Sequence, residues 1–206
     1  MYARSTTMVA DPRAVEEGIA FVRDQVWPSV KDMDGCLGIS MLLDRESGKA
    51  IITTSWETEE AIAASREPVR TLRERGTEIT SSDDPVVEEW EVASMHRAHN
   101  AYPDAFVRTT WSHVEQEDID SSLELYRNGM LPQIEQFEGF ASASLLIDRA
   151  TGRSALSVAF DSREAMENTR AAAQTMREQA EQAGIHVDEM AEFELALAHL
   201  HIPELV

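Results

Sequence analysis

The chain has 206 residues, of which 43% are hydrophobic, and its 38 acidic and 18 basic residues give a net charge of −20. This length suits one or two globular domains, and the negative charge disfavours binding to nucleic acid or to an anionic membrane surface. Cys36 is the single cysteine, so no intramolecular disulfide can form. Neither a signal peptide nor an apolar run of about 18 residues is recognisable, and we expect a cytoplasmic protein.

The first half of the chain predicts four strands and two helices. Their expected order is a strand over 2–9, a helix that starts at Pro12, strands over 36–43 and 49–56, a helix from 58 to about 75, and a strand over 86–96. Asp11 followed by Pro12 is a helix start signal. Pro68 falls inside the second helix and predicts a kink there, and Gly76 is expected to end that helix.

The second half predicts the same series of elements. They are a strand over 105–114, a helix from about 118 to 137, strands over 140–147 and 153–160, a helix from 162 to about 183, and a strand over 190–199. Ala172 stands where the first half has Pro68, so the kink is expected in the first half only.

The two halves also match residue by residue. GCLGISMLLDRESGKA from Gly35 aligns with GFASASLLIDRATGRS from Gly139 at an offset of 104, and the offset falls to 103 at the end of each half. A gap-free match of this length indicates a tandem duplication. We therefore expect a repeat over 1–98, a linker over 99–104 and a repeat over 105–206.

The order βαββαβ in each repeat predicts an α+β fold with two ferredoxin-like halves. Each half would have a four-stranded antiparallel sheet with both helices on one face. The uncovered faces of the two sheets predict an intramolecular pseudo-dimeric α+β barrel. Since this internal pairing would fill the usual dimer interface, we expect a monomer or a weak homodimer.

Two sequence blocks carry a family resemblance. Gly35, Gly38 and the pair Leu42-Leu43 precede a hairpin, which leads to Trp-Glu-Thr-Glu-Glu-Ala at 56–61; the second repeat has Phe-Asp-Ser-Arg-Glu-Ala at 160–165. This pattern resembles the antibiotic biosynthesis monooxygenase family. The resemblance implies the dimeric α+β barrel fold. It also implies oxidation of a small aromatic or quinol-like molecule in an apolar cavity, without metal or other cofactor.

The haem-degrading branch of that fold is disfavoured. The branch uses an Asn on the first strand, a Trp in the second helix and a His ligand after it. This chain has Ser-Thr-Thr at 5–7, Ser65 and Thr169 at the Trp position, and Glu74 and Glu178 near the ligand position.

Arginine and aromatic side chains are the candidate substrate-binding groups. Arg4 and Arg108 recur in the middle of the first strand of each repeat, where a guanidinium could hold an anionic oxygen; the alternative is an ion pair with Glu89, Glu91 or their equivalents. Four aromatic residues recur as pairs on the third and fourth strands and could form cavity walls or plain core. They are Trp56 with Phe160 and Trp90 with Phe193.

Histidines are the candidate proton acceptors. His96 and His199 recur at the end of the last strand, whereas His113 and Trp111 occur only in the second repeat. We expect His113 or His199 to act as base, because an imidazole titrates near neutral pH. His96 and Trp111 would contact the substrate. His99 and His201 lie close to His96 and His199 in sequence, but the spacings His-x-x-His and His-x-His are weak metal signals, and no metal site is expected. Because His113 and Trp111 occur in the second repeat only, we expect the better-formed polar pocket there.

A different class of function stays open. A duplicated chain can keep one copy as scaffold, so the alternative is a non-catalytic small-ligand-binding or structural protein of the same fold. Ligand pockets usually enclose about 300–1,000 Å³, and a much smaller void would disfavour an enzyme. The motif Asp-Arg-x-Ser/Thr-Gly-basic, at 44–49 and 148–153, lacks the glycine spacing of a phosphate loop and predicts a hairpin turn.

Overall fold

A computed structural model describes residues 1–99, 105–201 and 203–205. Its strands are β1 (Tyr2–Val9), β2 (Cys36–Leu43), β3 (Lys49–Trp56), β4 (Val86–Arg97), β5 (Phe106–His113), β6 (Phe140–Asp148), β7 (Arg153–Phe160) and β8 (His186–Leu200). Its α-helices are α1 (Val15–Phe21), α2 (Trp27–Val30), α3 (Glu59–Ala64), α4 (Arg66–Thr80), α5 (Ile119–Leu125), α6 (Leu131–Ile134), α7 (Arg163–Asn168) and α8 (Arg170–Gln182). The predicted α+β order is confirmed. The expected linker, apart from residue 99, lies outside the described residues.

The chain forms two compact units, each with its own antiparallel sheet. The units comprise Met1–Trp90 with Glu194–Ile202, and Glu91–Phe193 with Pro203–Val206. Strands β1, β3 and β2 lie side by side in the first unit and β5, β7 and β6 in the second, whereas β4 and β8 are each divided between the units. Residues 194–200 of β8 pair with β2, and residues 91–97 of β4 pair with β6. Compact units and sequence repeats are therefore two different divisions of this chain.

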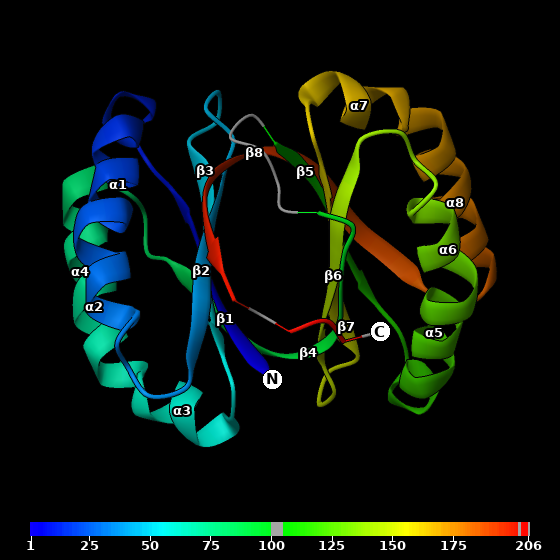
Figure 1. Ribbon diagram of the computed structural model, residues 1–206, viewed down its shortest axis with the longest axis horizontal. Coiled ribbons are helices and arrows are strands. Elements are labelled where there is room, and N and C mark those ends of the chain that lie inside the picture. The colour runs from blue at the N-terminus through cyan, green and yellow to red at the C-terminus, as the bar shows by residue number, and fades with distance from the viewer. Residues whose placement is uncertain (100–104, 202, 206) are drawn as a thin grey trace. The chain divides into compact units, whose positions relative to one another are not determined.

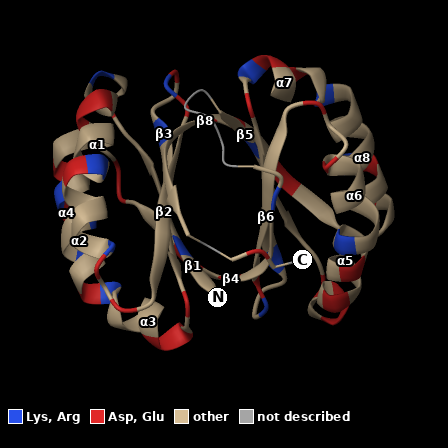
Figure 2. Ribbon diagram, in the orientation of Figure 1, with Lys and Arg blue, Asp and Glu red and all other residues tan. Residues whose placement is uncertain are grey.

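Helices cover one face of each sheet, as predicted for ferredoxin-like halves. Figure 1 shows α1, α2 and α4 against the sheet of the first unit, and α5, α6 and α8 against the sheet of the second. A separate hydrophobic cluster lies in each unit. Charged residues gather on the helices and in the turns in Figure 2. No helix in the described part of the chain is long and apolar enough to span a membrane.

The first helix of each repeat is widened in the middle. The π-helical segments η2 (Val22–Val26) and η4 (Tyr126–Met130) interrupt it, and Pro28 and Pro132 follow two residues later. Proline has no N–H and its ring clashes with the carbonyl four residues earlier, so the helix relaxes into a wider turn. The recurrence of the prolines thus has a structural reason.

The second helix is interrupted in both repeats, so the expectation of a kink in the first repeat only is wrong. Ser65 separates α3 from α4, and Thr169 separates α7 from α8. Pro68 lies in the first turn of α4, where backbone N–H groups have no intrahelical partner. The proline therefore fits the interruption and does not cause it.

Gly76 does not end α4, which continues to Thr80. A Cβ atom at Gly76 would lie 3.3 Å from Cε1 of Phe21, so this glycine allows close packing of α4 on α1. The helix ends at Ser81, which has a φ of 48° in the left-handed region.

The repeated Asp-Arg-x-Ser/Thr-Gly motif forms hairpin turns, as predicted. The Asp44 carboxylate accepts hydrogen bonds from the Glu46 backbone N–H and the Ser47 hydroxyl, and Asp148 plays the same part in the β6–β7 turn. Gly48 has a φ of 76°, and a Cβ there would lie 2.1 Å from a backbone oxygen. Glycine is therefore required at this position.

Candidate functional site

Each unit encloses a cavity between its sheet and its helices. The cavity of the first unit has a volume of about 60 Å³ and that of the second about 110 Å³. The polar residues on the first are Arg4, Thr6, Thr54, Arg73 and Thr80. Those on the second include Arg108, Thr110, Ser112, Tyr126, Ser154 and Arg177. Both cavities are smaller than a usual ligand pocket, and the second is the larger and more polar one.

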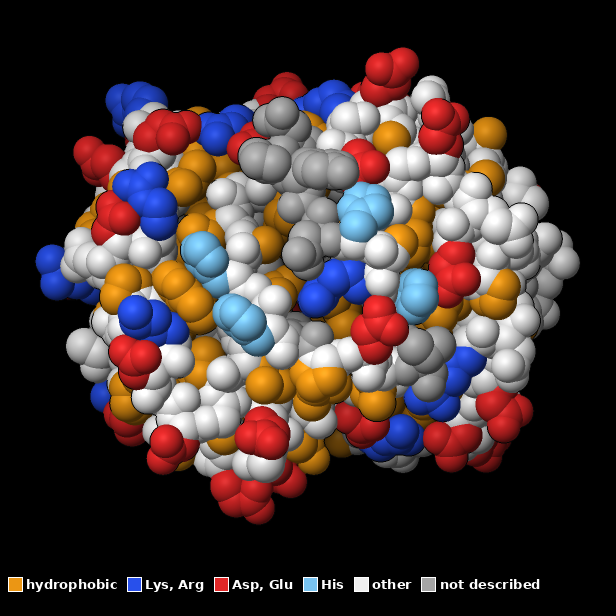
Figure 3. All heavy atoms as spheres, in the orientation of Figure 1, with side chains coloured by type: hydrophobic (Ala, Val, Ile, Leu, Met, Phe, Trp, Pro, Cys, Tyr) orange, Lys and Arg blue, Asp and Glu red, His pale blue; other side chains and the backbone are white. Residues whose placement is uncertain are grey.

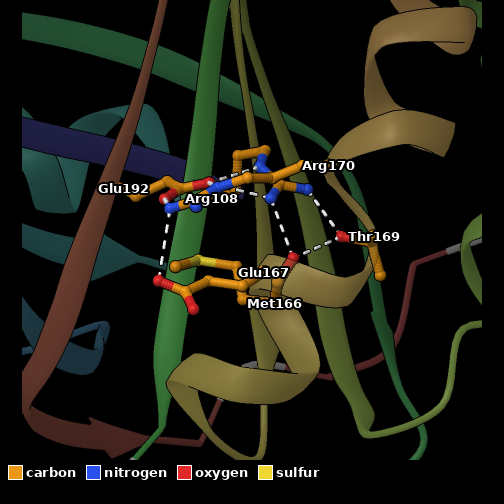
Figure 4. Close-up of polar contacts among 6 residues, drawn as sticks. All are labelled: Arg108, Met166, Glu167, Thr169, Arg170 and Glu192. Atoms are coloured by element: carbon orange, nitrogen blue, oxygen red, sulfur yellow. Dashed lines mark hydrogen bonds and ion pairs between the residues drawn. The ribbon is translucent and has the colours of Figure 1, made fainter.

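Arg108 lies on the wall of the second cavity, and protein groups occupy most of its donors. Its Nη1 donates to the Thr169 hydroxyl (2.7 Å) and its Nη2 to the Met166 carbonyl (2.9 Å), at the end of α7. Nη2 and Nε also donate to Glu192 at 2.8 and 3.2 Å. Figure 4 shows these bonds, with Arg170 on the same carboxylate. Arg108 thus holds the α7–α8 junction against the sheet.

Arg4 makes the same set of bonds in the first unit. It donates to the Ile62 carbonyl (2.6 Å), to the Ser65 hydroxyl (2.8 Å) and to Glu89 (2.7 and 3.0 Å). Arg66, then Arg4, holds the pKa of Glu89 down from 4.5 to about 2 although partial burial opposes this, and Arg170, then Arg108, lowers the pKa of Glu192. Of the two readings of these arginines, the ion pair with glutamate is the one observed.

Tyr126 is a cavity residue that the sequence analysis missed as a functional group. Burial raises the pKa of its hydroxyl to about 12, and the nearby Ser94 hydroxyl opposes this rise. The Tyr126 and Ser94 hydroxyls are both buried, and neither has a hydrogen-bond partner among the described residues. The offsets of 104 and 103 place Val22 and Leu197 at the corresponding positions of the first unit. The duplicated alignment alone could have shown this difference.

Trp111 and His113 do not line the cavity with Arg108. Arg108, Thr110 and Ser112 face it, and side chains alternate along a strand. Trp111 and His113 therefore lie on the opposite face of β5. Trp111 packs edge-on against Phe193, with ring centroids 6.3 Å apart.

The contacts that His113, His96 and His199 make also lie outside the two cavities. His113 lies 2.8 Å from Asp188, His96 lies 3.2 Å from Glu135 and stacks on Phe140, and His199 stacks on Trp27. Histidine side chains reach the surface in Figure 3. Among the described residues, no three His, Cys, Asp or Glu side chains are placed to hold a metal ion.

Of the four paired aromatic residues, Phe160 lines the second cavity. Trp90 is buried and donates through Nε1 to the Ser5 hydroxyl at 2.9 Å. Trp56 is buried at the base of an open groove of about 530 Å³ and donates to Thr54 at 3.1 Å. Phe193 is buried against Trp111. Phe160 also lies beside Arg108, whose Cζ atom is 5.9 Å from the centre of the Phe160 ring.

The second cavity combines apolar walls with a few hydrogen-bonding groups. Its walls are apolar, and its polar groups are hydroxyls and guanidinium groups. No described His, Asp or Glu lines it. The cavity thus offers hydrogen bonds to a ligand but no conventional general base at neutral pH.

Comparison with known proteins places the chain in a family. The sequence profile of the family "Antibiotic biosynthesis monooxygenase" matches residues 1–68. Two uncharacterized proteins of Mycobacterium tuberculosis are 49% and 46% identical over 208 residues, which cover 100% of this chain and 92% and 88% of theirs.

Solved structures show the same fold. A proposed monooxygenase of Fusobacterium nucleatum has a TM-score of 0.73 at 14% identity, covering 97% of this chain and 94% of its own. An anthrone oxidase-like protein has a TM-score of 0.68 at 14% identity, covering 99% and 94%. A haem-degrading enzyme of Listeria monocytogenes reaches 0.54 at 10% identity, covering 95% and 99%. The chain therefore belongs to the antibiotic biosynthesis monooxygenase family, as a tandem duplicate with the dimeric α+β barrel fold.

Proposed function

We propose that the cavity of the second unit binds a small single-ring aromatic molecule of the phenol or quinol class. The observation that carries this proposal is the buried Tyr126, a phenol on the wall of this cavity, where the first unit has Val22. Phe160 supplies an aromatic wall next to it. The cavity volume of about 110 Å³ is below the roughly 150 Å³ of an apolar cavity that holds benzene, so the ligand is at most a single small ring. Hydroquinone is a small quinol of this kind.

Binding without catalysis is the better supported form of this function. The cavity is well below the usual size of a ligand pocket, and its described lining holds no carboxylate or imidazole. The Tyr126 hydroxyl is buried and has no hydrogen-bond partner among the described residues. In the proposed complex it would donate a hydrogen bond to a ligand oxygen.

Cofactor-independent oxidation is the second candidate, and membership of the family favours it. As a monooxygenase, the protein would convert a quinol and O₂ to a hydroxyquinone and water, so that one oxygen atom enters the ring and the other leaves as water. The catalytic roles of His113 and His199, and the substrate contacts of Arg4, Trp56, Trp90, Trp111, Phe193 and His96, stay predictions. So do the weak-homodimer or monomer state, which light scattering tests, and the cytoplasmic location.

Calorimetric titration of the full chain with hydroquinone tests the binding proposal. We expect one site per chain, and Tyr126→Phe should weaken it about 3- to 10-fold through loss of one hydrogen bond. Val22→Ala, the matched change in the first unit, should leave the affinity unchanged. No heat above dilution, or equal weakening by both variants, would contradict the proposal. Oxygen uptake with the same compound separates binding from oxidation.

A further inference from the structure

Three buried polar atoms of the second unit have no hydrogen-bond partner in the described part of the chain. They are the Tyr126 hydroxyl, the Ser94 hydroxyl and Nδ1 of His96. Buried polar atoms nearly always have a hydrogen-bond partner, and an ordered water can supply it. Three such atoms on β4 and the neighbouring helical segment η4 therefore indicate one shared hydrogen-bonded network.

The three side chains follow one another from the second cavity towards the surface. Tyr126 lies on the cavity wall, and the Ser94 hydroxyl is near enough to oppose the rise in the pKa of Tyr126. Arg127 donates to the Ala93 carbonyl at 3.0 Å, which holds η4 on β4 beside Ser94. Ser94 and His96 are two residues apart on β4 with no register shift between them, so their side chains share one face and their Cα atoms are about 7 Å apart. One water molecule can bridge two polar groups at such a spacing.

His96 lies at the surface end of this network. Its Nε2 is 3.2 Å from the Glu135 carboxylate, its ring stacks on Phe140, and its side chain is 23% exposed. A carboxylate beside Nε2 favours the neutral tautomer that carries its proton on Nε2. The buried Nδ1 is then left as a proton acceptor. His96 and Glu135 thus have the arrangement of a base and the carboxylate that orients it.

The first unit keeps the histidine but lacks the other three groups. Its counterpart of His96 is His199, which stacks on Trp27. At offsets of 104 and 103, the counterparts of Tyr126, Ser94 and Glu135 are Val22, Leu197 and Lys31. All three groups that connect His96 with the cavity or orient its ring are therefore particular to the second unit.

We propose that Ser94 and His96 form a proton relay behind Tyr126, in which His96 accepts the proton of a quinol bound in the second cavity. The substrate of this relay rests on the proposed function. The quinol hydroxyl gives its proton to the Tyr126 oxygen, Tyr126 gives its own proton to Ser94, and Ser94 gives its own through a bridging water to Nδ1 of His96. Tyr126, Ser94 and the water end unchanged, while the quinol becomes an anion and His96 becomes an imidazolium paired with Glu135.

The relay supplies the base that the cavity wall lacks. No described His, Asp or Glu lines this cavity, yet a quinol has to lose its protons when it is oxidised. When a ligand only binds, the same hydroxyls are oriented the other way: Tyr126 donates to the ligand oxygen, Ser94 donates to Tyr126, and the water donates to Ser94 and to His96. Both orientations are possible because a hydroxyl group donates one hydrogen bond and accepts others.

Two-dimensional ¹H–¹⁵N NMR of the histidine side chains in the unliganded full chain tests the relay, at about pH 8 where an ordinary imidazole is neutral. We expect the His96 proton on Nε2 and a hydrogen-bonded Nδ1. Ser94→Ala and Tyr126→Phe should each move the Nδ1 resonance towards that of an imidazole nitrogen without a hydrogen bond, with the larger shift in Ser94→Ala. The His199 resonances, the matched control in the first unit, should not move. A proton on Nδ1, or an Nδ1 resonance that neither variant moves, would overturn the proposal.

Addition of hydroquinone extends the test to the cavity. Its binding should shift the His96 Nδ1 resonance of the unmodified chain, and Ser94→Ala should abolish that shift while calorimetry still detects binding. A His96 resonance that does not respond to bound hydroquinone would contradict the connection between His96 and the cavity. If hydroquinone does not bind at all, the proposed function fails, whereas the unliganded spectra still decide whether the relay exists. Far-UV circular dichroism checks that both variants, each of which removes one buried oxygen atom, are folded.

Discussion

The two units share their buried ion-pair network but differ in what lines their cavities. Arg4 and Arg108 each bind a helix-end carbonyl, a hydroxyl and a glutamate through the same atoms. The cavity walls have diverged, with Tyr126 in the second unit opposite Val22 in the first. Groups that hold the interrupted helix on the sheet have been kept in both copies, while groups that a ligand would meet have changed.

Replacing either buried arginine, Arg4 or Arg108, should change stability more than any other substitution that tests this comparison. We expect Arg4→Met and Arg108→Met each to lower the free energy of unfolding by about 3 kcal/mol, because each removes the hydrogen bonds of a buried guanidinium to a glutamate, a hydroxyl and a carbonyl, although the glutamate keeps its second arginine. Urea denaturation measures the change.

The control for that prediction is the exposed arginine on the same glutamate. Arg66 and Arg170 have side chains that are 59% and 56% exposed, so Arg66→Met and Arg170→Met should cost less than about 1 kcal/mol. If Arg4→Met and Arg108→Met differ greatly from each other, the two networks are not equivalent in energy despite their equal geometry.

A smaller effect should appear in acid. The pKa of Glu89 is lowered from 4.5 to about 2, so its contribution to stability is complete above about pH 4.5 and is lost as the pH falls towards 2. With its side chain 32% exposed, we expect about 1–2 kcal/mol after allowance for solvent screening. Glu89→Gln should remove this part of the pH dependence.

Urea unfolding at several pH values between 2 and 6 measures that slope. Glu192→Gln should act in the same direction, because the pKa of Glu192 is also lowered. An unchanged slope in Glu89→Gln would show that other carboxylates dominate acid unfolding.

Much of the fold could be predicted from the sequence because the duplication shows each pattern twice. The hairpins around Gly48 and Gly152 and the helix starts at Thr58 and Ser162 are local signals, and the structure contains them. The interruption of the second helix was not predicted, since it depends on Arg4 and Arg108 binding carbonyls about 58 residues away in sequence.

The cavity was less predictable, for a reason that concerns strand geometry. Arg108 and Trp111 are three residues apart, and Arg108 and His113 are five apart. Odd separations on a strand place side chains on opposite faces, so these residues cannot share one cavity wall. The alignment of the two repeats shows that Tyr126 differs from Val22, but its burial beside a cavity is known only from the three-dimensional structure.

The smallest effect concerns the proline that distinguishes the two second helices. In both repeats the helix restarts with the same backbone bond: Val69 N–H to the Ser65 carbonyl at 3.0 Å, and Ala173 N–H to the Thr169 carbonyl at 2.8 Å. Pro68 precedes the first of these donors, and Ala172 precedes the second. Ala172→Pro should therefore change the free energy of unfolding by less than about 1 kcal/mol, because the first turn tolerates proline.

Ala173→Pro, one residue later, is the matched control for that substitution. It removes the N–H that bonds to Thr169 and should cost about 3 kcal/mol. Urea denaturation of the two variants side by side decides the matter. Equal losses of stability in the two variants would mean that the second repeat needs the backbone N–H of residue 172, whereas the first repeat has Pro68 there and needs none. In that case the interruption at Thr169 would differ in kind from the one at Ser65, despite their similar bonds to Arg108 and Arg4.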